Sequence, residues 1–116
     1  MELKKLDRSA VANYKERPVR VMQFGEGNFL RAFVDWQIDI ANENGVLDTA
    51  VTIVSPRFDE NRAVKILKDQ QCTYHVLLEG IENGKPKREI RMISSVNDIL
   101  APELPADFEK YQALIN

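Results

Sequence analysis

The sequence predicts an α/β fold: a partial, doubly wound, Rossmann-like nucleotide-binding domain with an inserted β-hairpin. Three observations predict it. An apolar run ends at Gly25-Glu26-Gly27 and is followed at once by an amphipathic segment, as in a strand, a tight turn and a helix. A second apolar run, Thr49–Val54, follows that helix. Later, the pair Asn83-Gly84 separates two segments that are rich in strand-forming residues.

The first elements form one βαβ unit. Residues 1–17 are polar and irregular, with one short helical turn at most. A buried parallel strand is expected at Val19–Phe24, because three of its last four residues are apolar. The first helix should run from Asn28, a favourable N-cap residue, to about Asn44, with Gly45 as its C-cap. The second strand is Thr49–Val54, and a right-handed crossover should join the two strands.

The first helix carries a wide apolar arc. One stripe consists of Phe29, Phe33, Trp36 and Ile40, a second of Leu30, Val34, Ile38 and Ala41, and a narrow polar stripe of Arg31, Asp35 and Asp39. An arc this wide exceeds what one face of a sheet needs. Two interpretations follow: the helix is buried on most sides, or part of this surface meets another domain or a partner subunit.

The rest of the chain departs from the regular alternation of strand and helix. A second helix is expected over about residues 59–71 and a hairpin over Thr73–Ile81 and Lys87–Val96. Pro102 and Pro105 then interrupt the chain before a final short helix at Ala106–Ile115. The hairpin is therefore an insertion in the nucleotide-binding fold.

The glycine turn is the best candidate for a binding site. Gly25 permits a tight turn, Gly27 leaves room for a pyrophosphate against the backbone, and the helix N-terminus favours negative charge. Arg31 can reach the pyrophosphate or pair with Asp35, and Asn28 can cap the helix or bind a phosphate oxygen. The pattern G-x-G-x-x-G is incomplete, however, because Leu30 stands at its third glycine. A plain turn that binds nothing is the alternative.

The end of the second strand is the expected place of the adenosine ribose. A dehydrogenase that uses NAD commonly has Asp or Glu there. This chain has Ser55-Pro56-Arg57, with Asp59 and Glu60 slightly beyond. Arg57 alone would favour the 2′-phosphate of NADP.

Composition excludes several classes. A net charge of −2 provides no basic excess for nucleic acid, and no apolar run is long enough to span a membrane. The N-terminus lacks the apolar core of a signal peptide, and the single cysteine, Cys72, fits a reducing cytoplasm. The single histidine, His75, lies on an expected strand and is most simply a surface residue. Without metal-ligand spacing, no metal site is expected.

Residues 23–36, with the sequence Gln-Phe-Gly-Glu-Gly-Asn-Phe-Leu-Arg-Ala-Phe-Val-Asp-Trp, resemble the opening of the polyol-specific long-chain dehydrogenases, the mannitol dehydrogenase family. That family has the pattern G-x-G-x-F-x-R-A, which Gly25, Gly27, Phe29, Arg31 and Ala32 match. Residues 26–36 are most similar to its hexuronate branch, the tagaturonate reductases or altronate oxidoreductases. Residues 76–80 and 93–96 also resemble family segments, with less specificity.

The resemblance implies a parent enzyme that binds NAD and reduces tagaturonate to altronate. It also implies that Phe29 shapes the cofactor cleft in addition to packing in the core. The candidate cofactor-binding residues are Gly25, Glu26, Gly27, Asn28, Phe29, Arg31, Ser55 and Arg57. The resemblance favours NAD where Arg57 favours NADP, and we expect NAD.

The length of 116 residues suits one domain, whereas enzymes of this family are several times longer. We therefore expect residues 1–116 to be the N-terminal part of a dinucleotide-binding domain, without the helical catalytic domain. The family's catalytic motif, K-x-x-x-x-N-x-x-H, does not occur here, so no catalytic residue is assigned. The sugar acid would bind through the missing domain, and we expect the isolated piece to self-associate through its apolar helix. The alternative is a non-catalytic α/β module that binds a nucleotide or assembles with a partner.

Overall fold

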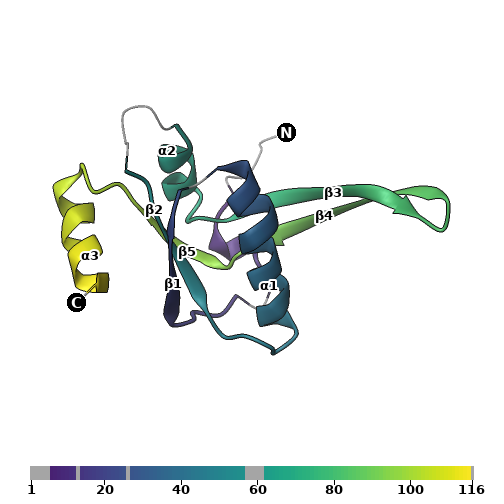
Figure 1. The fold of residues 1–116 in the computed structure, drawn as a ribbon, viewed down its shortest axis with the longest axis horizontal. Coiled ribbons are helices and arrows are strands. Elements are labelled where there is room, and N and C mark those ends of the chain that lie inside the picture. Colours follow the sequence, from purple (N-terminus) through teal and green to yellow (C-terminus); the bar gives the residue numbers. More distant parts are fainter. Residues whose placement is uncertain (1–5, 13, 26, 57–61, 116) are drawn as a thin grey trace.

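The computed structural model describes residues 6–12, 14–25, 27–56 and 62–115 (Figure 1). A short 3₁₀ turn at Arg8–Ala10 precedes the first strand. It corresponds to the one short helical turn expected within residues 1–17. The central sheet has three parallel strands: β1 (Val19–Phe24), β2 (Ala50–Val54) and β5 (Val96–Leu100). Their order is β1-β2-β5, so β2 is the central strand. This is half of a doubly wound sheet, and the predicted fold class is confirmed.

The carboxyl ends of the three strands lie level with one another. Phe24 of β1 is paired with Val54 of β2, and Val54 with Leu100 of β5. All five residues of β2 are buried, as expected for a central parallel strand with a continuous apolar sequence. The sheet therefore presents one common edge, where its connecting turns meet.

The first helix begins at Asn28 but is not regular. It contains a π-helical turn at Leu30–Val34 and continues as α1 (Asp35–Glu43). Its C-terminus is a Schellman motif: the N–H of Gly45, at φ +74°, donates to Asn42, and the N–H of Val46 donates to Ala41. The predicted helix and its C-cap glycine are thus present, but the π-helical turn was not predicted.

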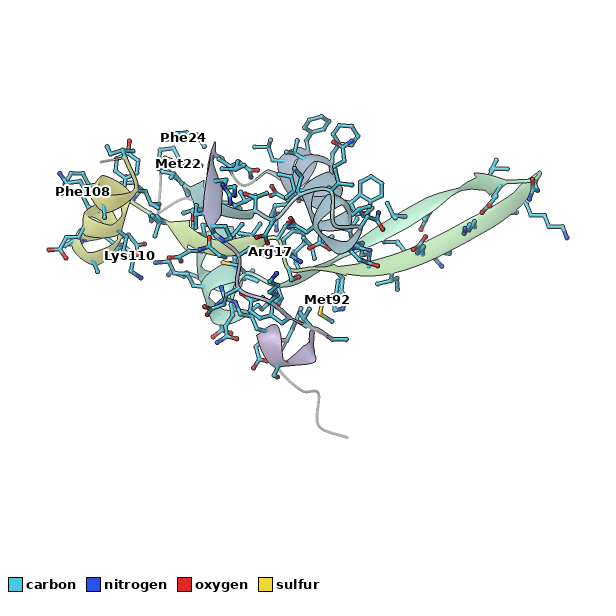
Figure 2. All side chains as sticks on the ribbon, turned by 90° about the horizontal axis from the view of Figure 1, so that it is seen from below. Arg17, Met22, Phe24, Met92, Phe108 and Lys110 are labelled. Atoms are coloured by element: carbon cyan, nitrogen blue, oxygen red, sulfur yellow. The ribbon has the colours of Figure 1, made fainter. Side chains whose placement is uncertain are left out.

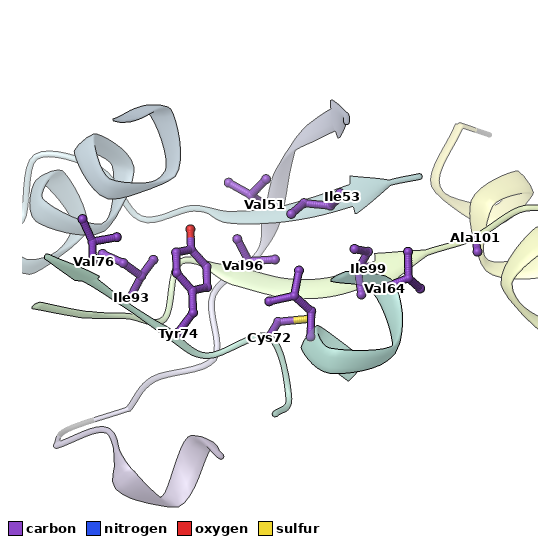
Figure 3. Close-up of a cluster of buried hydrophobic side chains, with 11 residues drawn as sticks. Val51, Ile53, Val64, Cys72, Tyr74, Val76, Ile93, Val96, Ile99 and Ala101 are labelled. Atoms are coloured by element: carbon purple, nitrogen blue, oxygen red, sulfur yellow. The ribbon is translucent and has the colours of Figure 1, made fainter. Parts of the chain in front are cut away.

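A single apolar core lies between the sheet, the helix α2 (Arg62–Asp69) and the base of the hairpin (Figure 3). Trp36 and Ile38 of α1 pack against this core. Its members, each nearly inaccessible to solvent, are Val51, Ile53, Val64, Leu67, Cys72, Tyr74, Val76, Ile93, Val96, Ile99 and Ala101. Because the hairpin base supplies several of them, the insertion is part of the domain's core.

The hairpin consists of β3 (Tyr74–Glu82) and β4 (Lys85–Ile93), joined at Asn83 and Gly84. Both turn residues have positive φ, +54° and +77°, as the Asn-Gly pair predicted. Figure 1 shows the hairpin projecting away from the sheet, on the side opposite to α3. Its outer half is exposed, including Ile81 and Ile90.

The predicted strand Lys87–Val96 is wrong at its end. β4 stops at Ile93, and Val96–Leu100 forms a separate strand that pairs with β2. Asn97 and Asp98 interrupt the apolar pattern of this segment. The fold accommodates them because the Thr52 hydroxyl donates to Asn97 Oδ1 over 2.7 Å, and Asp98 is only half-buried.

The last helix, α3 (Pro105–Ile115), begins one residue before its predicted start. Proline suits the first helical position, where its missing N–H costs nothing. The buried carboxylate of Asp107 accepts hydrogen bonds from Lys68 of α2 and from the N–H of Ala101, which tie α3 to the rest of the fold. Phe24 at the end of β1 and Phe108 on α3 are both exposed (Figure 2). No helix among the described residues is long and apolar enough to cross a membrane.

Candidate functional site

The glycine turn lies at the common carboxyl edge of the sheet. Gly25 follows β1 directly, and its N–H donates to the carbonyl of Val54 over 3.0 Å. Its φ of +114° is a conformation that only glycine adopts without strain. A Cβ at this position would also lie 3.4 Å from Leu30 Cδ1. Gly25 is therefore required by its backbone conformation, and a side chain at this position would in addition lie in contact with Leu30.

Gly27 is a glycine for a different reason. A Cβ built on it would meet no atom within 4 Å, and the residue is exposed. Its carbonyl accepts from the N–H of Arg31 over 3.1 Å, which begins the helical hydrogen bonding. The protein itself does not need the space beside Gly27, so that space is available to a bound group. A phosphate placed there would face the start of the helix, which favours negative charge.

Asn28 and Arg31 form one polar unit on the first turn of the helix. Arg31 Nη2 donates to Asn28 Oδ1 over 2.9 Å, and the guanidinium carbon lies 5.8 Å from the centre of the Tyr74 ring. Burial raises the pKa of Asp35, and the charge of Arg31 acts against that rise. Both candidates therefore lie beside the glycine turn, with the guanidinium held at the helix start.

The expected packing of Phe29 in the core is wrong. Phe29 is 71% exposed, Phe33 is 47% exposed, and their rings lie 5.2 Å apart on the surface. The π-helical turn explains the difference. The stripe was predicted for an α-helix with 3.6 residues per turn, whereas the i→i+5 hydrogen bonding of a π-helix widens the turn and rotates the side chains away from the predicted positions. The polar stripe faces inward instead, with Asp35 and Asp39 buried. The first interpretation of the apolar arc, a helix buried on most sides, is therefore wrong for the first half of the helix, where Phe29 and Phe33 are exposed.

The ribose side of the candidate site is described only in part. Ser55 follows β2, is buried, and donates its N–H to the carbonyl of Leu100 over 2.7 Å. It lies at the same sheet edge as the glycine turn. Glu26, Arg57, Asp59 and Glu60 lie outside the described residues.

A buried polar pair supports the turn, and its role was not predicted. Gln23 of β1 and Asp35 of α1 are 7% and 0% exposed. Gln23 Nε2 donates to the Gly25 carbonyl over 3.0 Å and to Asp35 Oδ2 over 3.2 Å. Burial raises the pKa of Asp35 to about 6, while the hydrogen bond from Gln23 and the charge of Arg31 act in the opposite direction. The available sequence signal was a glutamine between the apolar residues Met22 and Phe24 at the end of β1.

The hairpin base clamps the irregular part of the helix. The Tyr74 hydroxyl donates to the carbonyl of Arg31 over 2.8 Å, and Ser95 Oγ donates to the carbonyl of Asp35 over 2.8 Å. Burial raises the pKa of Tyr74 well above its usual range, so the hydroxyl remains a donor. These bonds satisfy carbonyls at both ends of the π-helical turn. The hairpin thus helps to set the shape of the helix next to the candidate site.

The remaining reactive side chains do not gather at this edge. His75 lies exposed on β3. Cys72 is buried in the core, and burial, followed by the charge of Asp98, raises the pKa of its thiol to about 12. Among the described residues, no group of three or more His, Cys, Asp and Glu side chains is placed to hold a metal ion.

A comparison with known protein families agrees with this geometry. Residues 19–116 match the mannitol dehydrogenase Rossmann domain. The chain belongs to the mannitol dehydrogenase family. The resemblance drawn from the glycine turn is thereby confirmed, and the matched region begins at the first residue of β1.

Curated relatives of this family member include several altronate oxidoreductases. The protein of that name from Bacillus subtilis is 36% identical over 112 residues, which cover 97% of this chain and 22% of the relative. That from Pectobacterium carotovorum subsp. carotovorum is 43% identical over 101 residues, which cover 86% of this chain and 20% of the relative. The chain thus spans about a fifth of the length of these relatives.

Two solved structures of polyol dehydrogenases share the fold. The Pseudomonas fluorescens mannitol 2-dehydrogenase, in a ternary complex with NAD and D-mannitol, superposes with a TM-score of 0.73 at 24% identity. The match covers 97% of this chain and 24% of that structure. A substrate-free D-sorbitol dehydrogenase superposes with a TM-score of 0.63 at 26% identity, covering 81% of this chain and 19% of its own.

Proposed function

We propose that this chain is the NAD-binding part of an oxidoreductase that reduces tagaturonate to altronate in hexuronate breakdown. The observation that carries the proposal is the open space at Gly27, beside a helix start and at the carboxyl edge of the sheet. The names of the altronate oxidoreductase relatives support the substrate. The NAD in the mannitol 2-dehydrogenase complex supports the cofactor.

The residues of this chain fit the phosphate side of such a cofactor. The backbone from Gly25 to Asn28 and the start of the helix would face the pyrophosphate. The Arg31 guanidinium at the start of the helix would add a charge-assisted hydrogen bond, and Ser55 at the same sheet edge would face the ribose. NADH, when bound, supplies the hydride, while these residues bind and orient it.

We further propose that the general base and the groups that recognise the sugar acid lie elsewhere in the parent protein. Two observations support this assignment: His75 is exposed on the hairpin, and the Cys72 thiol is buried with a raised pKa. We also propose a cytoplasmic location, which is supported by a single cysteine that has no second cysteine in the chain to pair with.

The test is substrate and cofactor preference in the full-length protein. Purified enzyme is given altronate or D-mannitol with NAD, and then with NADP, while the absorbance of the reduced nicotinamide is followed. We expect kcat/KM to be highest for altronate with NAD. A preference for D-mannitol would overturn the substrate assignment, and a preference for NADP would overturn the cofactor assignment.

A further inference from the structure

The pair Gln23 and Asp35 is unusual because both side chains are buried and neither is fully hydrogen bonded. Asp35 Oδ1 and Gln23 Oε1 have no hydrogen-bond partner among the described residues. Burying a carboxyl group without full satisfaction is costly, so its presence needs an explanation other than packing. The explanation lies in what the two amide hydrogens of Gln23 bind.

One of these hydrogens goes to the carbonyl of Gly25 and the other to Asp35 Oδ2. The N–H of Gly25 is held by Val54 on the other side. The glycine turn is thus fixed through both its N–H and its carbonyl.

Asp35 determines which end of the glutamine amide faces the turn. An amide can present either its oxygen or its nitrogen, and only the nitrogen can donate to the Gly25 carbonyl. A carboxylate accepts hydrogen bonds and does not donate them, so Asp35 selects the orientation in which the amide nitrogen faces both groups. Without an acceptor at this position, the amide is free to rotate, and the Gly25 carbonyl loses its donor.

We propose that Gln23 and Asp35 are positioning residues for the cofactor: Gln23 holds the glycine turn, and Asp35 holds Gln23. The inference rests on the proposed function, because it takes NADH as the group bound at the turn. Neither side chain needs to touch the cofactor. Their effect is to keep the backbone of the turn in the shape that a pyrophosphate requires.

The test uses Gln23→Met, Asp35→Leu and Asp35→Asn in the full-length protein. Asparagine retains an acceptor oxygen, whereas leucine and methionine are apolar. The matched control is Asn42→Ala at the other end of α1. Asn42 is also 7% exposed and makes two buried hydrogen bonds with the backbone of Thr49, over 2.8 and 3.0 Å. Calorimetric titration gives the Kd of NADH, and thermal denaturation reports the stability of each variant.

We expect Gln23→Met and Asp35→Leu to raise the Kd of NADH at least tenfold, and Asp35→Asn to remain within threefold of the original protein. Asn42→Ala should lose stability and keep its affinity. Equal affinities in all variants, or an equal loss in Asn42→Ala, would overturn the inference. If Asp35→Leu does not fold, the inference is tested by comparing the Kd of NADH for Gln23→Met with that for Asn42→Ala. If the unsubstituted protein binds no NADH, the proposed function itself fails, which is a separate outcome.

Discussion

Replacement of Gly27 by valine tests the candidate site most directly. A new Cβ at Gly27 would meet no protein atom within 4 Å, so the substitution should leave the fold almost unchanged. The same Cβ and its two methyl groups would occupy the space in which a pyrophosphate approaches the backbone. The structure therefore predicts a loss of binding that is separate from any loss of stability.

The size of the loss follows from the hydrogen bonds at the turn. Loss of two bonds to the pyrophosphate, at about 1–3 kcal/mol each, weakens binding by about 2–6 kcal/mol. That corresponds to a Kd for NADH that is roughly 30- to 20,000-fold higher. Isothermal titration of the full-length protein with NADH measures this change, and thermal denaturation shows whether the variant is folded.

Gly80→Val is the matched control. Gly80 lies in the hairpin strand β3, and a Cβ there also meets no atom within 4 Å. The Gly80→Val variant carries the same chemical change away from the carboxyl edge of the sheet. Its affinity for NADH should equal that of the original protein. Equal affinities for Gly27→Val and Gly80→Val, with both variants folded, would refute the assignment of the glycine turn as the cofactor site.

Three further predictions concern stability, pH and the isolated chain. Gly25→Ala should destabilise the protein by about 1–3 kcal/mol in urea denaturation, because φ is +114° and Leu30 is close. Since the pKa of Asp35 is raised from 3.8 to about 6, the stability that its protonated form confers is complete below pH 3.8 and is lost as the pH rises through about 6. The contribution of Asp35 to the free energy of unfolding should therefore fall by about 3 kcal/mol over this range, and Asp35→Asn should remove that contribution from the pH profile. The 116-residue chain alone should not oxidise NADH with tagaturonate, and it should self-associate in sedimentation through the exposed Phe29 and Phe33.

Each of these predictions would be contradicted by a specific result. A Gly25→Ala variant as stable as the original protein would show that the turn relaxes without strain. An unchanged pH dependence in Asp35→Asn would assign the titration to another group. Turnover by the isolated chain at the rate of the full-length enzyme would place the catalytic groups within residues 1–116. A monomer at all concentrations would remove the reason to expect a partner on the phenylalanine surface.

The glycine turn and the regular elements were predictable because their signals are local. The limits of β1 are those expected from the apolar run before Gly25, and the turn at Asn83-Gly84 has the positive φ angles that this dipeptide favours. The Schellman motif at Gly45 likewise depends only on neighbouring residues. In each case, the conformation follows from steric preferences within a few residues of chain.

The features that were missed depend on contacts between distant residues. β5 was not recognised because Asn97 interrupts its apolar pattern, and the hydroxyl that satisfies Asn97 belongs to Thr52 of another strand. The carbonyls of Arg31 and Asp35, within and just after the π-helical turn, accept hydrogen bonds from Tyr74 and Ser95 at the hairpin base. The periodicity of the helix sequence gives no information on either contact. The inward orientation of the polar stripe could therefore not be deduced from the helix alone.

The buried carboxyl of Asp35 links stability to binding in opposite directions. Protonation removes the cost of a buried charge, so acid stabilises the fold through this residue. The same protonation removes the charge that strengthens the hydrogen bond from Gln23, and the glycine turn is then held less firmly. Tyr74 stays neutral over this pH range because burial raises its pKa. As the pH falls through about 6, stability should therefore rise while the affinity for NADH falls slightly, by no more than the threefold expected for the equally uncharged Asp35→Asn. A residue that only stabilised the fold would move both quantities together.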